Sequence, residues 1–143
     1  MKNAVIICGH GHQASGLESG IKLIAGPMEN LRVVDFEEGD NFEILDGRLQ
    51  EAYESLKEAK NILFLTDLMG GTPFNRAVIL YGREKGVRVI SGVNFGMAYQ
   101  ALVSDADDID LYAEEVQAAA KDSMAMFKFN ESHVDENNEE DGI

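Results

Sequence analysis

The sequence predicts an α/β protein with a doubly wound, mainly parallel four-stranded sheet that carries helices on both faces. Short apolar runs, typical of strands, alternate along the chain with longer segments of helical periodicity. Such alternation is typical of β-α-β crossovers, which make neighbouring strands parallel and place helices over the sheet. We expect the strand order 2-1-3-4, in which the loops after strands 1 and 3 part and leave a crevice where ligands bind.

Four runs have the composition of strands. Residues 4–8 (AVIIC) and 62–65 (ILFL) are continuous and apolar, as expected of strands that are covered on both faces. Residues 31–36 (LRVVDF) and 87–90 (VRVI) are the other two. The first run is too short for a signal-peptide core or a membrane span.

The first two helices are expected between these strands. One should end at Gly26-Pro27, and its apolar positions at helical spacing are Leu17, Ile21 and Ile24. The next should begin at Asn41, which suits an N-cap. Its predicted buried face consists of Phe42, Leu45, Leu49, Ala52, Tyr53 and Leu56.

Three further helices are expected in the second half of the chain. Thr72 suits an N-cap and Pro73 suits the first helical position, so a helix should start there. We expect it to run to about Lys85 and to stop at Gly86. Residues 95–103 and 111–127 have the pattern of two more helices.

The composition is that of one ordinary domain with an acidic end. The chain has 143 residues, 45% of them hydrophobic, which is enough for a core. Residues 131–143 hold six acids and no Lys or Arg, and we expect a solvated, disordered tail after a domain at 1–130. The net charge of −14 makes nucleic acid and anionic membrane surfaces poor partners.

Cys8 is the one cysteine of the sequence. No internal disulfide is possible, and a reducing cytoplasm fits that composition. Because Cys8 ends an apolar run, we expect a buried small hydrophobe rather than a nucleophile.

His10 and Asp67 are the residues most suited to chemistry. His10 follows the first predicted strand and Asp67 follows the third, so the expected strand order brings both to one crevice. A carboxylate beside an imidazole accepts the proton of one ring nitrogen and stabilises positive charge on the ring. The other ring nitrogen keeps its lone pair free to attack phosphorus.

Neighbouring residues favour an anion in the same place. Gly11 gives the backbone freedom for close approach, while Gly71 and Thr72 lead into a helix N-terminus that attracts a phosphoryl group. We therefore expect Gly11, Gly71 and Thr72 to bind phosphate, with the Thr72 hydroxyl as a further donor. His12 is expected to be an exposed loop or helix-entry residue, and His133 to be solvated in the acidic tail.

Three segments together resemble one protein family. Residues 6–11 (IICGHG), 64–75 (FLTDLMGGTPFN) and 90–97 (ISGVNFGM) are similar to the ordered signatures of the IIA domain of mannose-class sugar phosphotransferase systems. The resemblance extends to about residue 130. It implies a phosphotransferase that works through a phosphohistidine at His10, with Asp67 as the partner of that histidine.

The same resemblance implies the partners of the chain. Members take phosphate from the small carrier protein HPr and give it to a IIB component, which phosphorylates sugar that enters through membrane IIC and IID components. No metal and no other cofactor is implied, and the location is cytoplasmic or peripheral to the membrane through that complex. Members are homodimers that exchange a C-terminal strand, here assigned to residues 125–129. The resemblance does not identify which sugar is transported.

Other classes of protein remain as alternatives. His10, His12 and Asp67 are plausible zinc or cobalt ligands, as in chelatase-like proteins. A receiver domain needs an acidic pair after the first strand, where this chain has Gly-His-Gly-His. A flavodoxin-type protein needs a Ser/Thr-rich phosphate loop there. A purely regulatory binding module is the last alternative.

Overall fold

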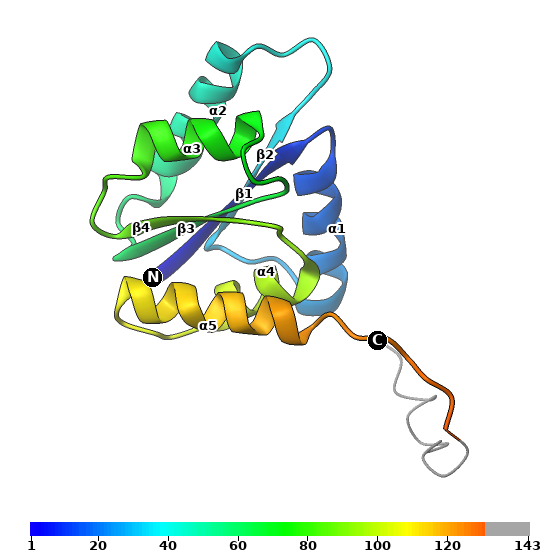
Figure 1. The fold of residues 1–143 in the computed structure, drawn as a ribbon. Coiled ribbons are helices and arrows are strands. Elements are labelled where there is room, and N and C mark those ends of the chain that lie inside the picture. Colours follow the sequence, from blue (N-terminus) through cyan, green and yellow to red (C-terminus); the bar gives the residue numbers. More distant parts are fainter. Residues whose placement is uncertain (131–143) are drawn as a thin grey trace.

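The computed structural model describes residues 1–130, which fold into four strands and five helices (Figure 1). The elements in chain order are β1 (Asn3–His10), α1 (Gln13–Ala25), β2 (Leu31–Phe36), α2 (Phe42–Leu56), β3 (Asn61–Thr66), α3 (Thr72–Tyr81), β4 (Val87–Ser91), α4 (Phe95–Val103) and α5 (Ile109–Asp122). No helix within residues 1–130 has the length and the apolar composition needed to cross a membrane.

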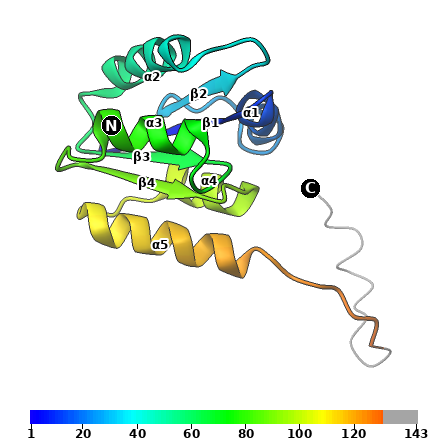
Figure 2. The same cartoon turned by 45° about the horizontal axis from the view of Figure 1, so that its top comes forward.

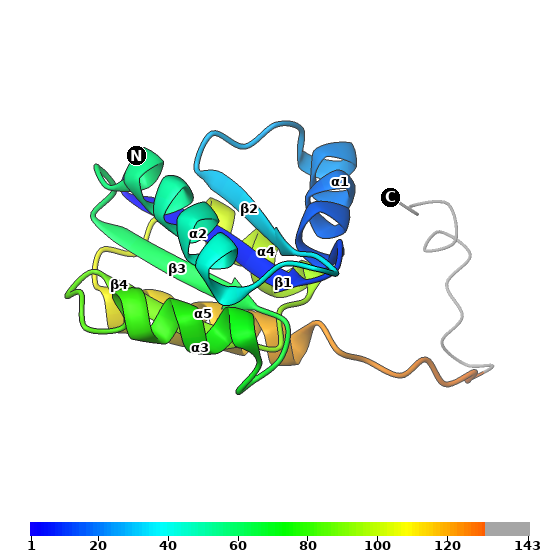
Figure 3. The same cartoon turned by 90° about the horizontal axis from the view of Figure 1, so that it is seen from above.

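The four strands form one parallel sheet in the order β2-β1-β3-β4 (Figure 3). β1 lies in the middle, where Val5 pairs with Leu31 of β2 on one side and with Leu63 of β3 on the other. The predicted fold class and strand order are therefore confirmed. The chain turns one way from β1 to β2 and the other way to β3, so the loops after β1 and β3 diverge at the carboxyl edge.

Helices cover the sheet on both faces and create two separate apolar cores. α2 and α3 lie over one face, and α4 and α5 lie over the other (Figure 2). Alternate residues of β1 serve the two cores: Ile6 packs toward α2 and α3, whereas Ile7 packs toward α1, α4 and α5. Two covered faces explain why β1 and β3 are continuously apolar.

The first helix boundaries agree with their sequence signals. α1 ends at Ala25, and Gly26 follows with φ of 76°, a conformation that glycine adopts at low cost. The Asn41 side chain caps α2 by accepting a hydrogen bond from the Ile44 N–H at 2.9 Å.

Two predicted boundaries of later helices are wrong. The N-cap of α3 is Gly71 rather than Thr72, so the helix begins one residue earlier than expected. α3 ends at Tyr81 because the chain leaves the helix at Gly82, and the expected stop at Gly86 instead leads into β4, where its carbonyl pairs with Ile62.

α5 is also shorter than the predicted helix over 111–127. It ends at Asp122, where the Ser123 hydroxyl donates to Ala120 O at 2.7 Å and stops the helix. Residues 124–130 have no helix or strand in the single chain, so the strand assigned to 125–129 is not formed there. The acidic tail at 131–143, including His133, lies outside the described residues.

Burial agrees with most of the predicted core. Cys8 is fully buried, and burial raises the pKa of its thiol to about 12, so it packs as a small hydrophobe. Phe42 was expected on the buried face of α2 but is 50% exposed. It starts the helix beyond the sheet and packs under the Arg76 guanidinium, 4.8 Å from its ring centre.

Candidate active site at the carboxyl edge of the sheet

His10 and Asp67 meet at the carboxyl edge of the sheet. His10 is the last residue of β1 and Asp67 directly follows β3, so the pairing of these two strands brings them together. One carboxylate oxygen, Asp67 Oδ2, accepts the backbone N–H of His10 at 2.8 Å and lies 2.8 Å from the ring Nδ1. The carboxylate is thus fixed to both the main chain and the side chain of the same histidine.

The electrostatics of this pair define the state of the imidazole. Burial acts to raise the pKa of Asp67, but the hydrogen bonds from the His10 N–H and ring outweigh it, and the pKa is lowered below its ordinary value. An ionised carboxylate only accepts, so Nδ1 carries the proton that lies between the two groups. The opposite ring nitrogen, Nε2, then has a free lone pair, and the His10 side chain is 46% exposed.

The imidazole is held in place on two further sides. The Phe36 ring lies edge-on to it, with 6.0 Å between the ring centres. A Cβ atom at Gly71 would lie 2.9 Å from Cε1 of His10, closer than carbon atoms approach without displacement. Gly71 therefore makes room for the ring, a role that the sequence pattern did not indicate.

The backbone donors near the imidazole differ from the predicted set. The Gly11 N–H donates to Phe36 O at 2.7 Å and the Gly71 N–H donates to Leu68 O at 3.0 Å, so both are used within the fold. At the start of α3 the first N–H groups have no partner inside the helix. Pro73 has no N–H, which leaves those of Thr72 and Phe74 as the donors of the first turn.

His12 does not join His10 and Asp67. Its Nδ1 lies 3.2 Å from Asp35 Oδ2 and 3.5 Å from Glu37 Oε1, on the β2 side of β1. β1 ends at His10, and Gly11, with φ of 59°, turns the chain before His12, so the two imidazoles go to different sides. Sequence reasoning did not single out Asp35, although it is the last residue but one of β2 and pairs with Gly9 near the end of β1.

Two acceptors beside the pair are buried without a hydrogen bond among residues 1–130. They are Asp67 Oδ1, on the far side of the carboxylate from His10, and Gln13 Oε1. A Cβ atom on Gly9 would lie 2.5 Å from Gln13 Oε1 and 3.3 Å from Asp67 Cγ. Glycine at position 9 therefore lets both side chains close over the end of β1.

A parallel α/β sheet with an imidazole–carboxylate pair at the crevice defines a class of small proteins suited to group transfer at that edge. Residues 4–124 match the family model EIIA-man, described as "PTS system fructose IIA component". The chain therefore belongs to this family of IIA components of the sugar phosphotransferase system.

Individual relatives agree with the family assignment. The chain is 34% identical over 108 residues to the mannose-specific EIIAB component of Escherichia coli, and 31% identical over 99 residues to the fructose-specific EIIA component of Bacillus subtilis. The solved mannose/sorbose-specific IIA subunit of Enterococcus faecalis has a TM-score of 0.79 at 29% identity, covering 92% of this chain and 98% of that one.

The lengths of these relatives differ. The match covers 76% of this chain but 33% of the Escherichia coli protein, so the chain spans about a third of that relative. The match to the Bacillus subtilis protein covers 69% of this chain and 68% of that protein.

Proposed function

We propose that this chain is a IIA phosphocarrier that accepts a phosphoryl group from phospho-HPr on His10 Nε2 and passes it to a IIB component. The observation that carries the proposal is the contact between His10 Nδ1 and Asp67 Oδ2, because it leaves Nε2 as the free nucleophile. The family assignment and the names of the relatives support the same role.

In this mechanism the phosphoryl group moves between two imidazoles. His10 Nε2 forms a bond to phosphorus as the N–P bond of the donor histidine breaks, and the departing imidazole takes up a proton. Asp67 stabilises the positive charge that develops on the His10 ring. Transfer to the IIB component repeats the exchange, with His10 as the leaving group. The net result of the two exchanges is phosphoryl transfer with a phosphohistidine intermediate.

Charge on the phosphoryl oxygens is met by the start of α3. The N–H groups of Thr72 and Phe74 and the Thr72 hydroxyl are the donors that we assign to this role. Such donors replace the metal ion that many phosphoryl-transfer enzymes use. Transfer should therefore continue without metal or nucleotide.

Incubation with enzyme I, HPr and phosphoenolpyruvate tests the assignment. We expect one phosphoryl group per chain by intact mass, mapped to His10 as an acid-labile, base-stable modification. His10→Ala should take up none, and His12→Ala serves as the matched control that keeps labelling. Phosphate on His12, His133 or Asp67 would contradict the assignment.

A second experiment tests the absence of a metal. Phospho-HPr is purified away from enzyme I and magnesium and is mixed with the chain in excess EDTA. Transfer at an unchanged rate is expected. Transfer that stops with EDTA and returns with added metal would overturn the mechanism.

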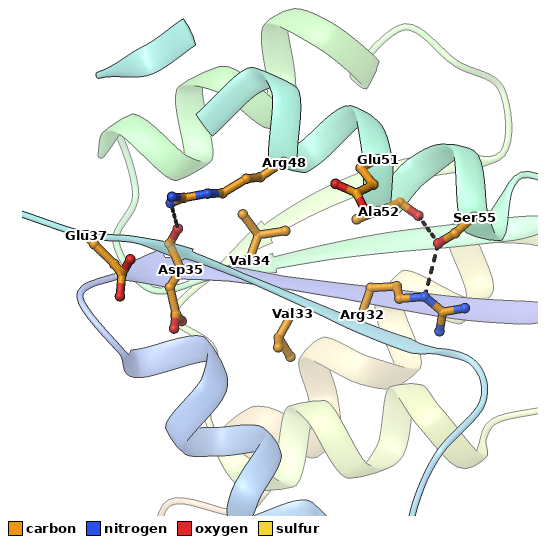
Figure 4. Close-up of a pocket in the computed structure, with 9 residues that line it drawn as sticks. All are labelled: Arg32, Val33, Val34, Asp35, Glu37, Arg48, Glu51, Ala52 and Ser55. Atoms are coloured by element: carbon orange, nitrogen blue, oxygen red, sulfur yellow. Dashed lines mark hydrogen bonds between the residues drawn. The ribbon is translucent and has the colours of Figure 1, made fainter. Parts of the chain in front are cut away.

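We further propose that the chain works as a homodimer. The two edges of the sheet differ. On β2 the Leu31 carbonyl accepts from Arg32 at 2.8 Å, and the Asp35 carbonyl accepts from Arg48 at 3.0 Å (Figure 4 shows the second bond). On β4, Arg88 donates to Val87 O at the start of the strand, and the edge beyond it is open among residues 1–130.

The segment after α5 has the side chains to cover that open edge. Its four large apolar side chains are 72–81% exposed in the single chain: Met124, Met126, Phe127 and Phe129. Large exposed apolar groups in sequence are typical of a surface that another chain buries. Pairing of this segment with β4 of a second copy would bury them and satisfy the edge.

A further inference from the structure

Three potential metal ligands meet on the side of β1 away from Asp67. His12 precedes α1, Asp35 belongs to β2 and Glu37 follows it. Figure 4 shows the Asp35 carboxylate pointing from β2 toward the start of α1. One ligand atom from each of the three side chains lies within 4.8 Å of the others. Within residues 1–130 this is the set of histidine, cysteine and acidic side chains that converges in this way, and it includes neither His10 nor Asp67.

Two of the three spacings between these atoms match the size of a transition-metal ion, and the third is within 4.8 Å. Zinc binds imidazole nitrogen and carboxylate oxygen at about 2.0–2.2 Å, which puts neighbouring ligands of a tetrahedron about 3.3–3.5 Å apart. His12 Nδ1 lies 3.2 Å from Asp35 Oδ2 and 3.5 Å from Glu37 Oε1. Glu37 is the member that adjusts, because its side chain is 44% exposed and lies in the loop after β2.

Asp35 is fixed before any ion arrives. Its Oδ1 accepts the Ser15 N–H at 3.0 Å and its Oδ2 accepts the Ser15 hydroxyl at 2.6 Å, and the side chain is 18% exposed. Each carboxylate oxygen has two lone pairs, so Oδ2 keeps one for a further partner. Two negative charges beside one imidazole also attract a cation from solvent.

We propose that His12, Asp35 and Glu37 bind one divalent transition-metal ion of the zinc class, with water completing the coordination. One nitrogen and two oxygen donors suit Zn²⁺ or Co²⁺, whereas Ca²⁺ and Mg²⁺ prefer oxygen alone. The ion would join the end of β1 to the end of β2. It takes no part in phosphoryl transfer, since both members of the His10–Asp67 pair lie outside the ligand set.

Calorimetric titration of the metal-stripped full chain with Zn²⁺ tests the site, and Co²⁺ reports geometry through its visible absorption. We expect one ion per chain. His12→Asn and Glu37→Gln should each raise the Kd by at least about tenfold, the size of effect that weakened ligation produces. Glu38→Gln removes the same charge from the neighbouring position and should leave the Kd within about twofold.

Two results would overturn the site. One is a Kd that stays within about twofold in His12→Asn and Glu37→Gln, or that rises equally in Glu38→Gln, which would indicate general attraction to an acidic surface. The other is loss of binding in His133→Asn, which would place the ion on the tail. Labelling of His10 in EDTA is measured on the same samples, so a failed metal site and a failed phosphocarrier role are distinguished.

Discussion

At the scale of single residues, the site depends on one carboxylate oxygen. Asp67 Oδ2 contacts both the N–H and the Nδ1 of His10, at 2.8 Å each. The carboxylate that orients the ring is thus held in place by the main chain of the same histidine. A change at Asp67 therefore alters tautomer, orientation and charge together.

Asp67→Asn should lower the rate of phosphoryl transfer from phospho-HPr by about 10²-fold or more. The amide keeps the size of the side chain but removes the negative charge that stabilises the phosphorylated imidazole. Rapid-quench measurement of transfer gives the rate, and unfolding by denaturant shows whether the variant is folded. A rate within about twofold of wild type would remove Asp67 from the mechanism.

Acid should destabilise the wild type more than Asp67→Asn. The pKa of Asp67 is lowered in the folded state, so its ionised form contributes stability above the unfolded value of about 3.9. That contribution is lost as the pH falls through the lower folded pKa. Denaturant unfolding at about pH 5 and about pH 3 compares the loss in the two proteins. Glu38→Gln is the charge-matched control and should behave as wild type; equal losses in all three proteins would contradict the prediction.

Sequence reasoning at this scale located His10 and Asp67 because each follows a recognisable strand. It predicted that Gly11 and Gly71 bind phosphate through backbone N–H groups near them, and the N–H groups of these two glycines themselves have partners within the fold. The partners of those groups, Phe36 O and Leu68 O, depend on loop geometry that no periodicity encodes. The same holds for the contact of His12 with Asp35, which joins residues of different strands.

At the scale of elements, α3 acts through its first turn. Its N-cap is Gly71, with no side-chain cap hydrogen bond, and Thr72 is the first helical residue. The Thr72 hydroxyl is therefore not needed as a cap. Removing this hydroxyl therefore tests its role toward the phosphoryl group without removing a helix cap.

Thr72→Val should reduce the transfer rate by about 10²-fold, the effect of removing one donor from a developing negative charge. The shape of the side chain is kept, so the free energy of unfolding should change little. Transfer kinetics and denaturant unfolding are measured on the same preparation. An unchanged rate would move the charge stabilisation to the backbone N–H groups alone.

Sequence signals placed some helix boundaries better than others. Asn41 marks the start of α2 correctly, because a capping side chain is a local interaction. The ends of α3 and α5 were placed too late, since the helical pattern continues beyond Tyr81 and Asp122. Helix termination there depends on Gly82 and on the Ser123 hydroxyl, which bonds Asn94 as well as Ala120.

At the scale of the whole molecule, the strand order followed from the alternation of strands and helices alone. The order β2-β1-β3-β4 places the ends of β1 and β3 side by side, and this places His10 beside Asp67. The association of two copies that we propose cannot be derived from the same pattern, because it depends on which sheet edge is left unpaired.

A chain that ends at Ser123 should be monomeric, and a chain that ends at Asn130 should remain a dimer. The first lacks the exposed Met124, Met126, Phe127 and Phe129, whereas the second lacks only the acidic tail. Light scattering after size exclusion gives the mass of each. Equal masses for the two chains would exclude the segment after α5 from the interface.

The two arginines along β2 also determine how far such an assembly can grow. Arg32 and, from α2, Arg48 donate to the carbonyls of Leu31 and Asp35, so a neighbouring strand can pair there only by displacing them. A sheet with one blocked edge can add a strand only at its other edge. In the dimer that we propose, reciprocal exchange through β4 closes at two copies, so the assembly does not extend into a fibre.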